Sequence, residues 1–103
     1  MRVIVLFNLR PGIGAAEYEA FAAGTDLPAV RALPSVAGFR VHALTGRLFG
    51  EGAAPFQYCE VLDIADGDRF GADVSTPAMQ AVAAKLQSFA DNPLFLTTRE
   101  VGA

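Results

Sequence analysis

The chain is poor in the residues that many catalytic and metal sites require. Its 103 residues contain no tryptophan, a single cysteine, Cys59, and a single histidine, His42. One cysteine excludes an intrachain disulfide and any zinc site built from several cysteines. Because there is one histidine and no serine in a nucleophile-elbow motif, a Ser-His-Asp triad is not expected either.

Charged residues are also scarce, at 18% of the chain, and they leave a net charge of −3. The 8 basic residues are scattered, so they form no stripe that follows a phosphate backbone, and we expect no nucleic-acid partner. No apolar run approaches the roughly 20 residues of a membrane-spanning helix, and the apolar start of about seven residues is too short for a signal-peptide core. These absences predict a cytoplasmic protein without a membrane partner.

Motifs for cofactors and metals are incomplete. Gly12-Ile13-Gly14 stands between a predicted strand and a predicted helix, but the third glycine of the dinucleotide fingerprint is missing. The acidic residues at positions 63, 66, 68 and 73 lack the spacing and the closing glutamate of a calcium loop, and we interpret them as helix caps. We therefore expect no cofactor and no metal.

Hydrophobic residues, by contrast, are abundant. They make up 52% of the chain, and the mean hydropathy is +0.34. The length predicts one domain over residues 1–103, and a domain of this size has little interior. We therefore expect part of the apolar surface to lie in a subunit interface or to line an apolar ligand cavity.

The order of the predicted elements indicates a fold class. Short apolar runs predict strands over residues 3–7, 39–44, 56–62 and 94–101. Helical spacing predicts a helix from Ala15 to Gly24, a short turn capped by Asp26, and a longer helix that begins at Thr76-Pro77. This is the α+β, ferredoxin-like βαββαβ order, in which the helices cover one face of a four-stranded antiparallel sheet. Because the other face would be open and apolar, we expect a homodimer in which two sheets enclose a dimeric α/β barrel.

Four stretches carry a resemblance to a known family: VIVLFNLRPG, TDLPAVRALPSVAGFRVHALTG, FQYCEVLDI and STPAMQAVAAKLQSFADNPLFLTTREV. Together they cover nearly the whole chain, and they resemble the REDY-like HapK family. The resemblance implies the dimeric α/β-barrel fold, which monooxygenase-like, isomerase-like and polyketide-cyclase-like proteins share, and a role in secondary metabolism. It implies no particular catalytic residue.

The alternation of side chains along each strand predicts which of them face the barrel cavity. We assign the wholly apolar sets to the helix layer: Val3, Val5 and Phe7; Phe39, Val41 and Ala43; Cys59 and Val61; Leu94 and Leu96. The opposite sets then face the cavity: Ile4, Leu6, Asn8, Arg40, His42, Leu44, Phe56, Tyr58, Glu60, Phe95, Thr97 and Arg99.

Three of these residues are the candidate catalytic groups, because histidine, tyrosine and glutamate commonly transfer protons. In this hypothesis Glu60 orients His42, and Tyr58 polarises a carbonyl group. The other members of the cavity set are candidate ligand-binding residues. A plainer interpretation is that Glu60 pairs with Arg40 or Arg99 and that His42 is a strand residue with its hydrogen bonds met.

The sequence thus predicts a protein that binds a small apolar or aromatic, polyketide-like carbonyl metabolite. Proton transfer of the cyclase or isomerase type is the leading hypothesis for its activity. The alternative is a non-catalytic carrier or accessory subunit of a biosynthetic enzyme. Polar groups that converge on an open cavity would favour the first interpretation, and a collapsed, dry barrel would favour the second.

Overall fold

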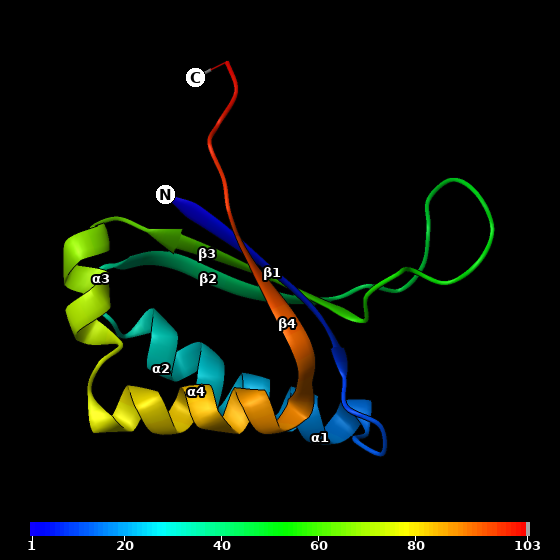
Figure 1. Cartoon of the computed structure of the whole chain (residues 1–103), viewed down its shortest axis with the longest axis horizontal. Coiled ribbons are helices and arrows are strands. Elements are labelled where there is room, and N and C mark those ends of the chain that lie inside the picture. Colours follow the sequence, from blue (N-terminus) through cyan, green and yellow to red (C-terminus); the bar gives the residue numbers. More distant parts are fainter. Residues whose placement is uncertain (103) are drawn as a thin grey trace.

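A computed structural model describes residues 1–102, and it contains one antiparallel sheet of four strands. The strands are β1 (Arg2–Leu9), β2 (Val36–Ala43), β3 (Tyr58–Ile64) and β4 (Ala90–Thr97). Their order across the sheet is β2-β3-β1-β4, and each neighbouring pair is antiparallel. The helices lie on one face of this sheet (Figure 1). The predicted ferredoxin-like fold is therefore confirmed.

The first crossover is one helical segment rather than two separate helices. It consists of α1 (Ala15–Phe21), a π-helical turn η1 (Ala22–Asp26) and α2 (Leu27–Arg31), which follow each other without a break. The predictions that the helix ends at Gly24 and that Asp26 caps a new turn are wrong. Asp26 has helical dihedral angles and its side chain caps nothing. The helix continues because its buried stripe continues past the glycine, with Ala22 and Val30 on either side of Asp26 at spacings of four residues.

The second crossover contains α3 (Gly67–Asp73) and α4 (Pro77–Phe89). The predicted start of the longer helix is confirmed, because the Thr76 hydroxyl accepts a hydrogen bond from the Met79 amide at 3.3 Å. Helix α3 was not predicted, although Asp66 does cap it by accepting a hydrogen bond from the Arg69 amide at 3.1 Å. No helix among residues 1–102 is both long and apolar enough to cross a membrane.

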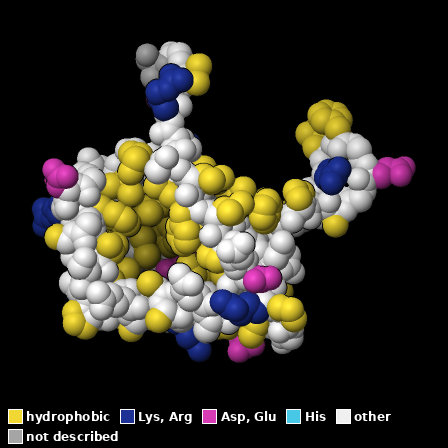
Figure 2. Space-filling model, in the orientation of Figure 1, with side chains coloured by type: hydrophobic (Ala, Val, Ile, Leu, Met, Phe, Trp, Pro, Cys, Tyr) yellow, Lys and Arg dark blue, Asp and Glu magenta, His cyan; other side chains and the backbone are white. Residues whose placement is uncertain are grey.

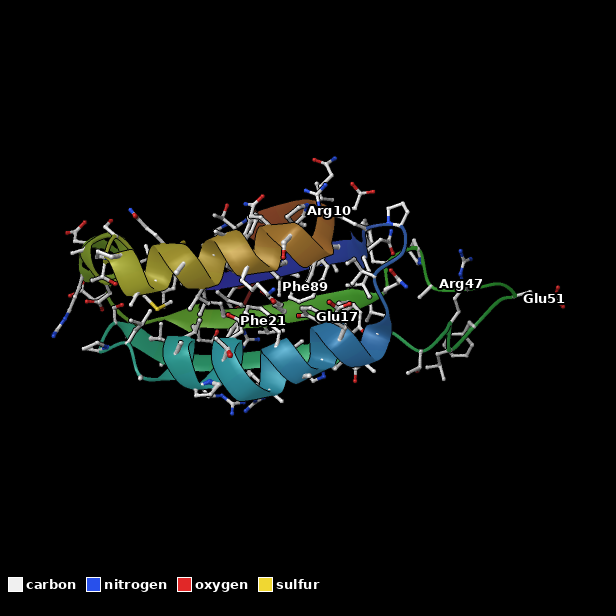
Figure 3. The ribbon with its side chains drawn as sticks, turned by 90° about the horizontal axis from the view of Figure 1, so that it is seen from below. Arg10, Glu17, Phe21, Arg47, Glu51 and Phe89 are labelled. Carbon is white, nitrogen blue, oxygen red and sulfur yellow. The ribbon has the colours of Figure 1, made fainter. Side chains whose placement is uncertain are left out.

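An aromatic cluster fills one end of the layer between the sheet and the helices. The ring of Tyr18 packs edge-on against Phe7 and Phe89, with centroids 5.3 and 5.9 Å apart. Phe21 and Phe89 lie between α1 and α4, with centroids 5.3 Å apart (Figure 3). These rings are large and rigid, so they fix the spacing of the helix and sheet layers.

The register of β3 reverses the predicted facing of that strand. Glu60 lies opposite Val5, and Tyr58 lies opposite Phe7, so both side chains point to the helix layer. The prediction that they face the open side of the sheet is wrong, because it rested on the apolar pair Cys59 and Val61. The observed strand extends to Ile64, which is buried on the same face as Glu60.

The facing predicted for β4 is also wrong. The strand begins at Ala90, and the register shifts next to Asn92, which has a positive φ of 49°. The shift inverts the alternation that follows, so Leu94 pairs with Leu6 on the open face, and Phe95 pairs with Val5 on the helix face. The facing predicted for β1 agrees with the structure, with Val5 and Phe7 buried under the helices.

A long loop, residues 44–57, projects from the end of β2 and β3 (Figure 1). Arg47 and Glu51 lie on it, well away from the helices (Figure 3). The side chain of Asn8 holds the base of this loop, because its amide donates to the Pro55 carbonyl and accepts from the Gln57 amide. Asn8 therefore has a structural role at this position.

Candidate functional site

A cavity of about 340 Å³ lies between the sheet and the helices, beside the aromatic cluster. Figure 2 shows it as a hollow lined by hydrophobic side chains, with an acidic side chain at its floor. Side chains from every strand and from α2, α3 and α4 line it, among them Val5, Phe39, Leu62, Phe70, Val82 and Phe95. Small-molecule sites begin at about 300 Å³, so this cavity suits a compact ligand.

Asp26 is one of two carboxyl groups in this apolar cavity. It lies at the end of η1 and is 4% exposed, and its Oδ2 atom has no hydrogen-bond partner among residues 1–102. Burial raises the pKa of this carboxyl to about 6, because the charged form loses its hydration. A π-helical turn often marks a functional position within a helix. Within the described part of the chain, Asp26 Oδ2 is therefore a buried acceptor without a donor.

Glu60 is the second carboxyl group, and it enters the cavity from β3. It is 3% exposed, and the Tyr18 hydroxyl donates to its Oε2 atom at 3.4 Å. Burial, together with the negative charge of Asp26, raises the pKa of Glu60 to about 8, although the Tyr18 hydrogen bond opposes the shift. At neutral pH the pair therefore holds one proton and one negative charge, with the proton favoured on Glu60. Two carboxyls whose pKa values are pushed apart can serve as an acid and a base at one site.

The two tyrosines near Glu60 differ in their surroundings. Burial and the neighbouring Glu60 raise the pKa of Tyr18 far above its usual range, so it acts as a neutral hydrogen-bond donor. Tyr58 lies against Phe7 and Tyr18 in the aromatic cluster, and its hydroxyl donates to Glu19 Oε2 at 2.7 Å. Burial and this hydrogen bond raise the pKa of Tyr58 to about 12. Tyr58 thus joins α1 to the sheet and does not line the cavity.

His42 lies on the opposite face of the sheet from Glu60. It pairs with Cys59, which in turn pairs with Leu6, so these three side chains share the open face. His42 is exposed there, as expected for the predicted strand. The structure therefore does not bring His42 together with Tyr58 and Glu60.

The predicted ligand-binding residues divide among several places. Four of them lie on or beside the open face: Ile4, Leu6, Arg40 and, just beyond the end of β2, Leu44. Phe56 lies half-buried near the base of the loop with Asn8, Thr97 pairs with Val3, and Arg99 lies in a surface groove beside Arg2 and Asp63. Only Phe95 joins Glu60 in lining the cavity. The alternative pairing of Glu60 with Arg40 or Arg99 is not observed among residues 1–102.

Asp26 was not predicted as a site residue, although the sequence contains a signal for its burial. Tyr18, Ala22, Asp26 and Val30 follow one another at intervals of four residues, so the aspartate interrupts an apolar helical stripe. An acidic residue in such a stripe is buried once the stripe packs against the sheet. Within residues 1–102 no group of three or more His, Cys, Asp or Glu side chains is placed to hold a metal ion.

Comparisons with known proteins agree on the fold. The family model for "REDY-like protein HapK" matches residues 1–101. The crystal structure of HapK from Hahella chejuensis is similar, with a TM-score of 0.72 and 26% identity, and the match covers 100% of this chain and 95% of that chain. SnoaB from Streptomyces nogalater, described as a cofactor-independent oxygenase, is similar with a TM-score of 0.70 and 17% identity over 98% and 94% of the two chains.

A third similar structure comes from Thermobifida fusca and is described as a dimeric ferredoxin-like protein of unknown function. Its TM-score is 0.67 and its identity is 24%, over 92% of this chain and 85% of that chain. The search of curated proteins found no match.

Proposed function

Since the chain belongs to the REDY-like HapK family, we propose that it binds a small apolar or aromatic carbonyl metabolite between its sheet and its helices and transfers a proton on it. The observation that carries the proposal is the pair of buried carboxyls, Asp26 and Glu60, in a cavity with otherwise apolar walls and a single amide, Gln80. An apolar cavity with a few convergent polar groups is the usual form of a small-molecule site.

The pair supplies an acid and a base for keto–enol conversion. Glu60 holds a proton at neutral pH and donates it to the carbonyl oxygen of the ligand, while the Asp26 carboxylate removes a proton from the neighbouring carbon. The ligand then becomes an enol, with no net gain or loss of electrons. One proton has passed to Asp26 and one has left Glu60, and exchange with water restores the starting state. Isomerisation and aldol-type cyclisation both begin with this step.

Tyr18 and Tyr58 act as positioning residues in this proposal. The Tyr18 hydroxyl holds one oxygen of Glu60, which leaves the other oxygen free for the ligand. Tyr58 fixes α1 against the sheet through Glu19 and keeps the Tyr18 ring in place. His42 takes no part in the proton transfer, because it lies on the other face of the sheet.

The open face supports the proposal of a homodimer. Leu94 and Leu96 are 42% and 43% exposed there, and they continue the apolar surface of Ile4 and Leu6 on β1. An exposed apolar sheet face of this kind is normally covered. Two sheets packed through this face would form the predicted barrel and would leave each helix-side cavity within its own subunit.

The proposal is tested by hydrogen–deuterium exchange at the acidic CH₂ of 2-tetralone, a small aromatic ketone, followed by proton NMR in D₂O. We expect the protein to accelerate the exchange, and we expect Glu60→Gln to reduce the acceleration at least tenfold. His42→Asn is the matched control, because it changes a titratable residue on the other face, and it should leave the rate unchanged.

Two results would argue against the assignment. If Glu60→Gln exchanges as fast as the unmodified protein, or if His42→Asn abolishes the exchange, the helix-side cavity is not the reactive site. If 2-tetralone binds in the cavity without accelerated exchange, the carrier or accessory role replaces the catalytic one.

A further inference from the structure

The charges around the cavity bear on the class of ligand that it accepts. Its lining contains two carboxyls and the neutral Gln80, and it contains no lysine, arginine or histidine. Two basic groups of the helix layer have partners elsewhere, since Arg31 donates to the Phe39 carbonyl and the Lys85 ammonium lies 5.1 Å from the centroid of the Phe89 ring. A negative ligand would therefore meet no opposite charge inside the cavity.

Asp26 adds a preference for ligands that carry a hydrogen-bond donor. Its Oδ2 atom is buried and has no partner, and an unsatisfied buried acceptor is costly. An ionised carboxylate accepts hydrogen bonds and donates none, so only a donor on the ligand can satisfy it. An N–H or O–H group does so, and a positively charged donor does so more strongly.

We infer that the cavity selects its ligands by charge, taking neutral or cationic molecules and rejecting carboxylates, sulfates and phosphates, and that a hydrogen-bond donor placed against Asp26 strengthens binding. The inference rests on the proposed function, because it names the substrate class of the same site. It implies that a metabolite processed here carries no free acid at the buried end. Any carboxyl group of a precursor must already be esterified, cyclised or lost when the molecule enters.

The electrostatics of the cavity favour neutral and cationic ligands over anionic ones. In a low-dielectric cavity an anion is repelled by the carboxylate, and it loses its hydration without gaining a cationic partner. The Tyr18 hydroxyl donates to Glu60, and Gln80, the other polar residue of the lining, is exposed; both are neutral at physiological pH, and the lining residues from β1 and β2 are apolar. Nothing lining the cavity offsets the negative charge.

Three naphthalene probes of nearly equal size test the inference by titration at pH 7. They are 2-naphthalenemethanol, which is neutral, 2-naphthylmethylammonium, which is cationic, and 2-naphthoate, which is anionic. The chain has no tryptophan, so naphthalene fluorescence reports binding without that background. We expect 2-naphthoate to bind at least tenfold more weakly than the alcohol, and the ammonium to bind more tightly than the alcohol.

Asp26→Asn should reduce both differences, because it removes the charge that repels the anion and attracts the ammonium, and Glu51→Gln on the projecting loop is the control that should change nothing. A second measurement needs no variant: the preference for the ammonium over the alcohol should grow between pH 5 and pH 9, as the two carboxyls ionise.

Equal binding of 2-naphthoate and the alcohol would overturn the inference and leave the proposed function standing. If none of the three probes binds, both fail. If the alcohol binds, the anion does not, and no proton exchange is seen with 2-tetralone, only the proposed catalysis fails.

Discussion

Replacing Glu60 with glutamine should remove a large part of the pH dependence of the protein's stability between pH 5 and pH 9. The folded pKa of Glu60 is raised from 4.5 to about 8, chiefly by burial. The folded state therefore binds this proton more tightly than the unfolded chain does. The contribution of Glu60 to stability is fully present below pH 4.5 and is lost as the pH rises toward about 8.

The pKa shift of Glu60 sets how much stability is lost between the two pH values. At about 1.4 kcal/mol for each pH unit, the free energy of unfolding should fall by roughly 4–5 kcal/mol between pH 4.5 and about pH 8. That is a large share of the roughly 5–15 kcal/mol by which a domain of this kind is stable. Glutamine has nearly the same shape and still accepts the Tyr18 hydrogen bond, but it cannot ionise.

Urea denaturation followed by circular dichroism at pH 5, 7 and 9, at one protein concentration, measures the effect. We expect Glu60→Gln to match the unmodified protein near pH 5 and to be more stable than it by several kcal/mol at pH 9. Glu51→Gln, which changes an exposed carboxylate on the loop, should follow the unmodified protein throughout. Equal pH slopes for Glu60→Gln and the unmodified protein would refute the assignment of a buried, protonated Glu60.

Other perturbations test the packing and the assembly. Phe89→Ala removes a ring that is 3% exposed and in contact with Phe21 and Tyr18, so the free energy of unfolding measured with urea should fall by roughly 3–5 kcal/mol. A loss below about 1 kcal/mol would mean that Phe89 is not a core residue. The melting temperature should rise with protein concentration, because the proposed dimer would stabilise the folded chain by mass action. Leu96→Lys places a charge on the open face, so sedimentation equilibrium should show more monomer than for the unmodified protein. A folded monomer of the unmodified protein at micromolar concentration would contradict the proposed dimer.

The element order could be predicted from the sequence because its signals are local. Thr76 and Pro77 start a helix by capping chemistry and by a fixed φ, and the spacing of Leu86 and Phe89 identifies the face that packs on the sheet. The side of β1 that faces the helices could also be predicted, because Val3, Val5 and Phe7 form a wholly apolar set, whereas the opposite set contains Asn8. These features depend on neighbours a few positions away in the chain.

The facing of β3 and β4 could not be predicted in the same way. Both faces of β3 contain apolar residues, so composition alone did not decide whether Glu60 or Cys59 is buried, and the partner residues that decide it lie on β1. In β4 the register shift near Asn92 inverts the alternation, and such a shift has no regular sequence signal. The candidate site moved from one face of the sheet to the other as a result.

The burial of Asp26 could not be predicted from its neighbours in the sequence. Asp26 lies two residues after Gly24 and two before Pro28, so it fits the pattern of a helix cap as well as a place in the apolar stripe. The tertiary packing of α1 and α2 on the sheet decides between the two interpretations. It turns Asp26 into the cavity next to Glu60, where the two carboxyls influence each other.

The central claim is that the ligand binds between the sheet and the helices, and methyl NMR tests it most directly. Titration of 2-naphthalenemethanol into protein labelled at its methyl groups would report on both faces of the sheet at once. We predict shifts at Val30, Leu62 and Met79, which line the cavity, and unchanged signals from Leu6, Leu94 and Leu96 on the open face. Shifts confined to the open-face methyl groups would contradict the claim and would return the binding site to the interior of a barrel between two sheets.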